Sequence, residues 1–366
     1  MNRSRAFAGF TIIELLVTVA IVGILMGMLI PAVSAVRSES RRSQCMNNLR
    51  QLSIASQNFE SAQGFIPPAA RFGEGTGWHA YILPYIERQE LYEQIMITDP
   101  EQNFEWSADG KPVLETILPV FKCPSDPAPP FVESQFSDFV SSAVLERGVC
   151  SYLACASGTV PDVASDLRSS KLELKIGDES DALAQTLVRG MRSGAMTPTQ
   201  TFIDHSTLNS PYPKFQTKVK YADILDGTSN TILLGEGIFD TSHHFNLAGD
   251  SRSVGMDHWY IGSGDMDISI ASQATTNPVR DFSEFMATTA IRFNYYHFKR
   301  AQLDYDGLGD SLFRDQLSYS FNSWHSGDGI NFALTDGSAK WIRAGVDPEI
   351  RANLGMIADR KKVGDF

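Results

Sequence analysis

The strongest pattern in the sequence is an uninterrupted apolar run near the N-terminus. Residues 10–30 carry a single charged side chain, that of Glu14. A helix of ~20 apolar residues is long enough to cross the hydrocarbon core of a bilayer. A cleaved secretory signal is the alternative, but its apolar core is usually only ~7–15 residues and ends in a small-x-small cleavage site. The longer run, which passes into a polar helical stretch, predicts a retained transmembrane helix over residues 10–36.

A pattern with helical spacing follows directly. One mostly apolar face recurs at intervals of three and four residues, at Cys45, Leu49, Leu52, Ser56 and Phe59. Gly64 and the prolines at 67 and 68 end it. We predict that residues 37–64 continue the transmembrane helix as an amphipathic half. Two unrelated helices are the alternative, with Pro31 as the one turn signal between them.

Near the C-terminus the apolar positions alternate with the period of a strand. Ile330, Phe332 and Leu334 alternate with polar or small residues, and the return strand contains Trp341. Asp336-Gly337 lies between them, and Asp-Gly is a strong signal for a hairpin turn, so these two residues are interpreted as turn residues first and ligands second. Asp226-Gly227 has the same character ahead of another apolar run.

These patterns together predict an α+β fold with one long N-terminal helix packed on an antiparallel β-sheet head. The head covers residues 65–366. Residues from about 160 to 220 mix a helical stretch with Ser-, Thr- and Pro-rich flanks, which favours a variable insertion on the head.

Composition narrows the functional classes. The chain has 366 residues, of which 43% are hydrophobic and 20% charged, so it can bury a core and is not disordered throughout. Lys and Arg number 31 against 43 Asp and Glu, a net charge of −12. An acidic chain lacks the basic surface that nucleic acid requires, so we expect no nucleic-acid partner.

The segment before the apolar run carries a processing motif. Residues 1–9 form a short leader with two arginines, and residues 9–14 read GFTIIE. This resembles the prepilin peptidase recognition sequence of type IV pilins and type II secretion pseudopilins. The resemblance implies cleavage after Gly9 and methylation of Phe10 by the prepilin peptidase/N-methyltransferase. It also implies an inner-membrane, single-pass protein with a cytoplasmic N-terminus and a periplasmic head. The arginines flanking the span do not themselves choose this orientation.

Four residues of the predicted span are candidates for assembly with other pilin-like subunits. Glu14 is costly in an apolar surround and needs a partner, although a carboxylate that snorkels to the interface is the simpler alternative. Gly23 and Gly27 form a G-x-x-x-G pair that would let another apolar helix approach, a motif with many false positives. Pro31 lies where such pilins carry a helix-bending proline.

A second resemblance covers nearly the whole chain. Five blocks occur in the order of the DUF1559 family, which is prepilin-like and described by a C-terminal H-X9-DG motif: 45–60 (CMNNLRQLSIASQNFE), 77–92 (GWHAYILPYIERQELY), 121–127 (FKCPSDP), 221–236 (YADILDGTSNTILLGE) and 325–341 (HSGDGINFALTDGSAKW). His325, Asp336 and Gly337 match that motif. Ten residues, 326–335, separate the histidine from the aspartate where the family has nine, which puts a fixed His–Asp geometry in doubt.

The four cysteines, Cys45, Cys123, Cys150 and Cys155, are an even number without a C-x-x-C spacing. In an oxidising compartment disulfides are favoured over zinc, and we favour the pairs 45–123 and 150–155 among three connectivities. Buried free thiols are the alternative.

The sequence of the head contains only weak signals for a metal-binding or catalytic site. Histidines 243, 244, 258, 297 and 325 have no spacing that places metal ligands on one face, and neither a P-loop nor G-x-S-x-G is present. A partial calcium loop, which is the one cofactor considered, consists of Asp304, Asp306, Asp310 and Asp315. Leu308 and a final Asp in place of Glu depart from the calcium pattern.

We therefore predict a membrane-anchored, pilin-like envelope protein that acts through assembly or surface and secretion structures and is not an enzyme. A membrane-tethered head that binds a ligand such as polysaccharide is the second hypothesis, and a tethered hydrolase is the third. Exposed tryptophans lining one groove would favour ligand binding, whereas their burial would favour assembly. The tryptophans concerned are Trp78, Trp106, Trp259 and Trp324.

Overall fold

The structure is a computed structural model that describes residues 11–72, 76–95, 116–127, 131–134, 145–157, 194–196, 199–200, 218–238, 286–289, 292–294 and 320–357. Several predictions fall outside these ranges: the leader with Gly9 and Phe10, most of the insertion at 160–220, and the four aspartates of the calcium loop.

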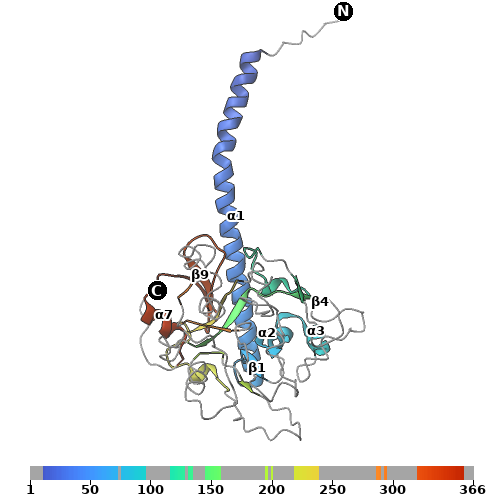
Figure 1. The fold of residues 1–366 in the computed structure, drawn as a ribbon, viewed down its shortest axis with the longest axis vertical. Coiled ribbons are helices and arrows are strands. Elements are labelled where there is room, and N and C mark those ends of the chain that lie inside the picture. The colour runs from blue at the N-terminus through green and yellow to red at the C-terminus, as the bar shows by residue number, and fades with distance from the viewer. Residues whose placement is uncertain are drawn as a thin grey trace, which may run out of the picture.

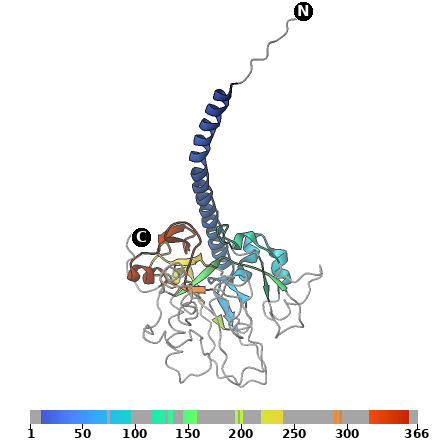
Figure 2. The same cartoon turned by 45° about the horizontal axis from the view of Figure 1, so that its top comes forward.

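One helix, α1 (Ile12–Gln63), runs through both apolar patterns without a break. Figure 1 shows its N-terminal half standing clear of the head and its C-terminal half entering it. Thr11 caps the start with its side chain, and Gly64 ends the helix in the left-handed conformation, at φ 81°. Pro31 lies inside the helix, which curves gently (Figure 2). The prediction of one continuous helix is confirmed.

The two halves of α1 differ in burial, because only the second half has a buried face. Large apolar side chains from Ile12 to Val36 are exposed, Ile12 at 79%. The face predicted for the second half is buried, with Cys45, Leu49 and Leu52 at 0% exposure. By length and composition α1 is able to cross a membrane. The exposed half is the surface that a bilayer or another helix would cover.

The head is built on a five-stranded sheet of order β10-β9-β7-β5-β8. Its strands are β5 (Tyr152–Ser157), β7 (Ile232–Glu236), β8 (Met286–Thr288), β9 (Gly329–Leu334) and β10 (Ala339–Arg343). All pairs are antiparallel except β5 with β8. The α+β fold is therefore confirmed, with one parallel pair at an edge of the sheet that the alternation pattern did not predict.

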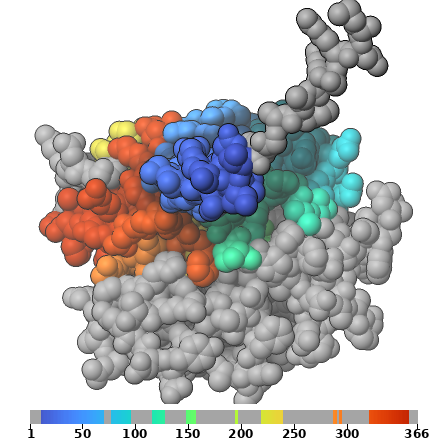
Figure 3. Space-filling model, turned by 90° about the horizontal axis from the view of Figure 1, so that it is seen from above, coloured from blue at the N-terminus to red at the C-terminus, as the bar shows by residue number. Residues whose placement is uncertain are grey.

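Helix α1 is fixed to this sheet by hydrogen bonds as well as by its apolar face. The Ser53 hydroxyl donates to the Leu334 carbonyl at 3.0 Å, and the Gln57 amide donates to the Thr335 carbonyl at 3.0 Å. Figure 3, a view from the N-terminal end, shows α1 flanked by the orange and red C-terminal segment on one side and by green and cyan segments on the other.

Smaller elements surround this core. Short strands form two further sheets, β2-β1-β6 (Thr76–Gly77, Ala70–Phe72, Thr199–Gln200) and β3-β4 (Phe131–Ser134, Leu145–Gly148). The short helices are α2 (Trp78–Ile82), η1 (Leu83–Ile86), α3 (Gln89–Gln94), η4 (Pro119–Phe121), η5 (Tyr221–Asp223) and α7 (Pro348–Leu354).

Both Asp-Gly pairs are turns, as their sequence predicts. Strands β9 and β10 form the predicted hairpin, and Gly337 in its turn has a φ of 88°. Gly227, in the loop before β7, has a φ of 94°. The two loops bind each other, because the Asp336 amide donates to the Thr228 carbonyl at 3.0 Å. Both aspartates therefore serve loop structure.

Candidate functional site

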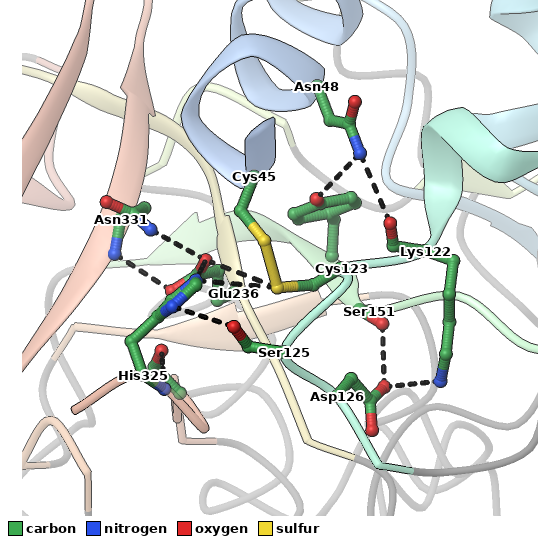
Figure 4. The surroundings of a disulfide bond; sticks show 12 residues. Cys45, Asn48, Lys122, Cys123, Ser125, Asp126, Ser151, Glu236, His325 and Asn331 are labelled. Carbon is green, nitrogen blue, oxygen red and sulfur yellow. Dashed lines mark hydrogen bonds and ion pairs between the residues drawn. A yellow bond between two sulfur atoms is a disulfide. The ribbon is translucent and has the colours of Figure 1, made fainter. Parts of the chain in front are cut away.

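A disulfide between α1 and the segment after η4 lies at the centre of the most concentrated chemistry in the described residues. It joins Cys45 to Cys123, which are 78 residues apart in sequence and 5.2 Å apart at Cα. Cys45 belongs to the buried face of α1, and Cys123 follows the short helix that covers that face (Figure 4). The structure thus contains the first of the two predicted pairs.

A buried glutamate–histidine pair lies against this disulfide. Glu236, the last residue of β7, accepts from Nε2 of His325 at 3.1 Å, and the two side chains are 2% and 1% exposed. Asn331 of β9 donates twice to the same carboxylate, from its side-chain amide at 2.8 Å and from its backbone at 3.0 Å. The second histidine nitrogen, Nδ1, is 3.0 Å from the Ser125 hydroxyl. Each polar group of the pair is therefore held by a partner, as burial requires.

Cys45, Cys123, Glu236 and His325 form one group, which we call the Cys–Glu–His cluster. The Cys123 sulfur is 3.5 Å from His325 Nε2 and 3.9 Å from Glu236 Oε1. The donor atoms of all four residues lie within 4.8 Å of one another, and all four residues are buried. Sulfur, imidazole and carboxylate are the donor types that bind zinc in proteins.

A second polar network anchors the segment that carries Cys123. The buried Asp126 carboxylate accepts from Lys122 at 2.6 Å and from the Ser151 hydroxyl at 2.7 Å. From α1, Asn48 donates to the Lys122 carbonyl and to the Tyr152 hydroxyl, both at 3.2 Å. Burial raises the pKa of Tyr152 well above its usual value, so the hydroxyl stays protonated. These contacts fix the Cys123 segment independently of the disulfide.

The second predicted disulfide, between Cys150 and Cys155, is wrong. Neither cysteine belongs to a disulfide, and both are buried. Cys155 lies inside β5, which begins two residues after Cys150. Five residues of extended chain span ~16 Å, whereas disulfide-bonded Cα atoms lie ~5.5–6 Å apart.

Cys150 instead contacts His79, with Sγ and Nε2 3.1 Å apart. Burial raises the pKa of the Cys150 thiol, and burial lowers the pKa of His79 well below its usual value. The pair is therefore a neutral thiol beside a neutral imidazole. It lacks the thiolate that a nucleophilic cysteine needs.

The histidine and the Asp-Gly pair of the C-terminal motif do not meet. His325 precedes β9 and joins the Cys–Glu–His cluster, whereas Asp336 lies in the exposed turn at the far end of β9. A six-residue strand spans about 20 Å. The ten residues between the histidine and the aspartate include an exposed bend at 326–328, where Gly327 has a φ of 102°. The motif therefore marks the two ends of one strand.

The assembly candidates lie far along α1 from the cluster, in its exposed half. Glu14 accepts from the Thr11 amide at 2.9 Å and from the Thr11 hydroxyl at 2.8 Å, which completes a capping box. A Cβ added at Gly23 or Gly27 would meet nothing within 4 Å, so the helix face that both glycines share is open to a neighbour.

Of the four tryptophans considered for a ligand groove, Trp78 is buried at 0% exposure and belongs to the core. Trp324 is partly buried, and the other two lie outside the described residues. Trp78 therefore cannot line a surface groove.

Sequence reasoning missed three residues of the site: Glu236, Ser125 and Asn331. Glu236 had a usable signal, because a lone carboxylate ends the apolar strand ILLGE and a buried charge needs a partner. Ser125 and Asn331 had none, since their roles depend on segments that are distant in sequence.

Comparison with family models gives two matches. Residues 34–349 match a family described as Protein of unknown function (DUF1559), and residues 4–30 match the Prokaryotic N-terminal methylation motif. Searches of curated proteins and of solved structures found no match. The methylation motif implies a prepilin-like envelope protein that prepilin peptidase processes. Because the family match covers most of its length, this chain belongs to the DUF1559 family and carries a prepilin-type methylation motif.

Proposed function

We propose that this protein is a pilin-like or pseudopilin-like subunit of the cell envelope. Prepilin peptidase cleaves it after Gly9 and methylates Phe10, and the exposed half of α1 then anchors it in the inner membrane. The head lies on the extracytoplasmic side. The protein works through assembly with other pilin-like subunits, in surface or secretion structures, and performs no catalytic step.

The observation that carries this proposal is the division of α1 into two halves with opposite surroundings. Its N-terminal half presents apolar side chains on all sides, and its C-terminal half is part of the head core. Because one continuous helix forms both the span and part of the head core, packing of the span against another subunit also fixes where the head lies. The methylation motif at residues 4–30 supplies the processing signal directly before this span.

Glu14 is the residue that would set the register of assembly. Cleavage makes Phe10 a new N-terminus with a cationic amine, about one helical turn from Glu14. In the isolated chain Glu14 is bonded to Thr11, which satisfies its hydrogen bonds but leaves its charge unmatched. In an apolar bundle the amine of a neighbouring subunit can match it, and an unmatched charge there is costly.

The ligand-binding alternative has less support. It requires aromatic side chains on an accessible groove, and Trp78 is in the core instead. A cysteine hydrolase would need an activated thiolate, which the neutral Cys150–His79 pair does not supply.

Substitutions at the cleavage site, Gly9, and at the charged residue of the span, Glu14, test the proposal. In cells that contain a prepilin peptidase, we expect Gly9→Val to leave full-length protein in the membrane. We expect Glu14→Val to insert and be cleaved but to be lost from cross-linked subunit complexes. Intact-mass spectrometry reads the processing, and cross-linking in membranes reads the assembly.

Gly23→Val is the matched control for processing. It makes the same glycine-to-valine change as Gly9→Val, but inside the span and away from the cleavage site, so the protein should be cleaved normally. A wild-type chain that keeps its Met1–Gly9 leader beside an active peptidase would overturn the proposal. Normal cross-linking of Glu14→Val would overturn only the charge pairing.

A further inference from the structure

We propose that the Cys–Glu–His cluster is a zinc site whose oxidised form is the Cys45–Cys123 disulfide. In the dithiol state the two cysteine sulfurs, one oxygen of Glu236 and Nε2 of His325 would bind one Zn²⁺ tetrahedrally. This inference goes beyond the proposed function: in an oxidising extracytoplasmic compartment the disulfide is the resting form, and the zinc form requires a dithiol reductant.

The distances among the donors match a tetrahedral site. Zinc bonds of ~2.3 Å to sulfur and ~2.0–2.2 Å to nitrogen and oxygen place neighbouring donors about 3.3–3.8 Å apart. Cys123 Sγ is 3.5 Å from His325 Nε2 and 3.9 Å from Glu236 Oε1, and those last two atoms are 3.1 Å apart. The Cys45 sulfur lies within 4.8 Å of the same atoms. Opening the disulfide is the one large adjustment required.

Burial makes the site a closed one. As whole residues, backbone included, Cys45, Cys123, Glu236 and His325 are 0%, 5%, 2% and 7% exposed. Structural zinc sites use four protein ligands and leave no position for water. Two thiolates and a carboxylate would carry three negative charges in this buried space, and a dication would compensate two of them.

The surrounding groups orient the ligands as in established metal sites. A metal-bound histidine usually bonds through its other ring nitrogen, and here Nδ1 of His325 is 3.0 Å from the Ser125 hydroxyl. Asn331 orients the Glu236 carboxylate, with its backbone amide donating to Oε2 at 3.0 Å and its side-chain amide donating to Oε1 at 2.8 Å. Oε1 also faces the Cys123 sulfur and the imidazole (Figure 4). A bare disulfide needs neither a histidine nor a carboxylate beside it.

The scaffold keeps the donors together when the disulfide is open. Lys122, Asp126 and Ser151 hold the Cys123 segment through their own contacts. Ser38 of α1 lies 2.9 Å, hydroxyl to hydroxyl, from Ser326, beside His325. Each segment that carries a ligand is therefore anchored by bonds other than the S–S bond.

The two forms interconvert by a balanced reaction. A dithiol reductant transfers two electrons and two protons to the S–S bond, becomes a disulfide itself, and leaves two protein thiols. Zn²⁺ then displaces the two thiol protons and binds both thiolates. Oxidation by a disulfide oxidant releases the metal again.

Cobalt binding by the full-length protein in detergent tests the proposal, because Co²⁺ occupies zinc sites and reports its ligands spectroscopically. After reduction and removal of the reductant without oxygen, we expect a single Co²⁺ per chain with a thiolate-to-cobalt charge-transfer band and the visible bands of tetrahedral cobalt. Equimolar Zn²⁺ should displace it. The oxidised protein is a control with an identical sequence and should show no such band.

Variants identify the ligands. Cys45→Ser, Cys123→Ser and His325→Ala should abolish the charge-transfer band or change its intensity and position. Ser125→Ala, which keeps all four ligands, should weaken binding ~10–100-fold. Cys150→Ala and Cys155→Ala remove the thiols outside the cluster and should leave cobalt binding unchanged.

Two results would overturn the proposal. One is a reduced protein that is folded by circular dichroism but gives no charge-transfer band with cobalt. The other is a band that survives Cys123→Ser and disappears in Cys150→Ala, which would place the metal at the Cys150–His79 pair. If Cys45→Ser and Cys123→Ser do not fold, the Ser125→Ala affinity and the comparison of oxidised with reduced wild type still decide.

Discussion

Gly235 in β7 occupies a place where two aromatic rings leave no room for a side chain. A Cβ there would lie 2.5 Å from Cε1 of Phe332 and 2.6 Å from Cδ1 of Phe321. Both rings are fully buried and pack edge to face, with centroids 5.1 Å apart, so neither can move without opening the core. The absent side chain is thus part of the packing of the core.

Gly235→Ala should lower the free energy of unfolding by ~1–3 kcal/mol through overpacking. Gly345→Ala is the matched control, because a Cβ there meets nothing within 4 Å and should change stability little. Denaturant unfolding of the full chain in detergent compares the two. Equal midpoints for both variants would contradict the packing assigned to Gly235.

His79 makes the stability of the head depend on pH. Burial lowers its pKa in the folded state, while in the unfolded chain the pKa is ~6.5. Below pH ~6.5 the unfolded state binds a proton that the folded state does not, so stability falls as the pH falls, by up to ~1.4 kcal/mol per unit.

Replacing His79 by Phe, which can keep the contact with the Trp78 ring 3.8 Å away, should make this dependence shallower. Melting temperatures measured from pH 7.5 to 5.0 would show the variant losing less stability than the wild type. Parallel curves for the two proteins would mean that another group carries the pH dependence.

Residue-level predictions succeeded where local pattern decides the outcome. The burial of Cys45 follows from helical spacing, and the turn at Asp336 follows from the Asp-Gly pair. The Cys–Glu–His cluster could not be predicted, because Glu236 is 89 residues from His325 and nothing near either residue encodes their contact. The wrong 150–155 disulfide arose from proximity in sequence, which in a strand means separation in space.

At the scale of elements, the second half of α1 has a buried face and an exposed face, and large apolar residues lie on both. Leu52 is fully buried against the head, and Ile54, two positions further on, is 49% exposed. Replacing each of these two side chains by alanine therefore separates the contribution of packing from that of helix propensity.

Leu52→Ala should destabilise the head by ~2–5 kcal/mol, because it leaves a cavity under the helix. Ile54→Ala should be nearly neutral, since its side chain is half exposed and alanine favours helix. Thermal unfolding of both variants in detergent checks this. A comparable loss in Ile54→Ala would show that this face of α1 is covered by something else.

The elements that sequence predicted are the ones with short-range signals. The long helix has periodicity and a glycine end, and the β9–β10 hairpin has alternation and a tight turn. The parallel pairing of β5 with β8 had no signal, since parallel strands are joined by long connections whose course is not set locally. The middle position of β7 in the sheet is likewise a long-range property.

For the whole molecule, the two halves of α1 predict different consequences of truncation. Removing residues 1–36 deletes the exposed apolar surface and should give a soluble, folded head. Removing residues 1–60 also deletes Cys45 and the buried face, and should expose the core and cause aggregation. Size-exclusion chromatography and melting curves compare the two products. Equal solubility and melting would contradict the packing of α1 in the head.

The bond from Ser53 to the Leu334 carbonyl joins positions 281 residues apart. At a synthesis rate of ~5–20 residues per second, the inner face of α1 leaves the ribosome roughly tens of seconds before the strand that covers it. During that time α2, η1 and η4 are already able to cover their part of the face, and only the part that β9 and β10 cover stays open. A chain that stops before β9 therefore keeps this part of the face exposed, so closure of the head by the last hairpin distinguishes finished subunits from incomplete ones.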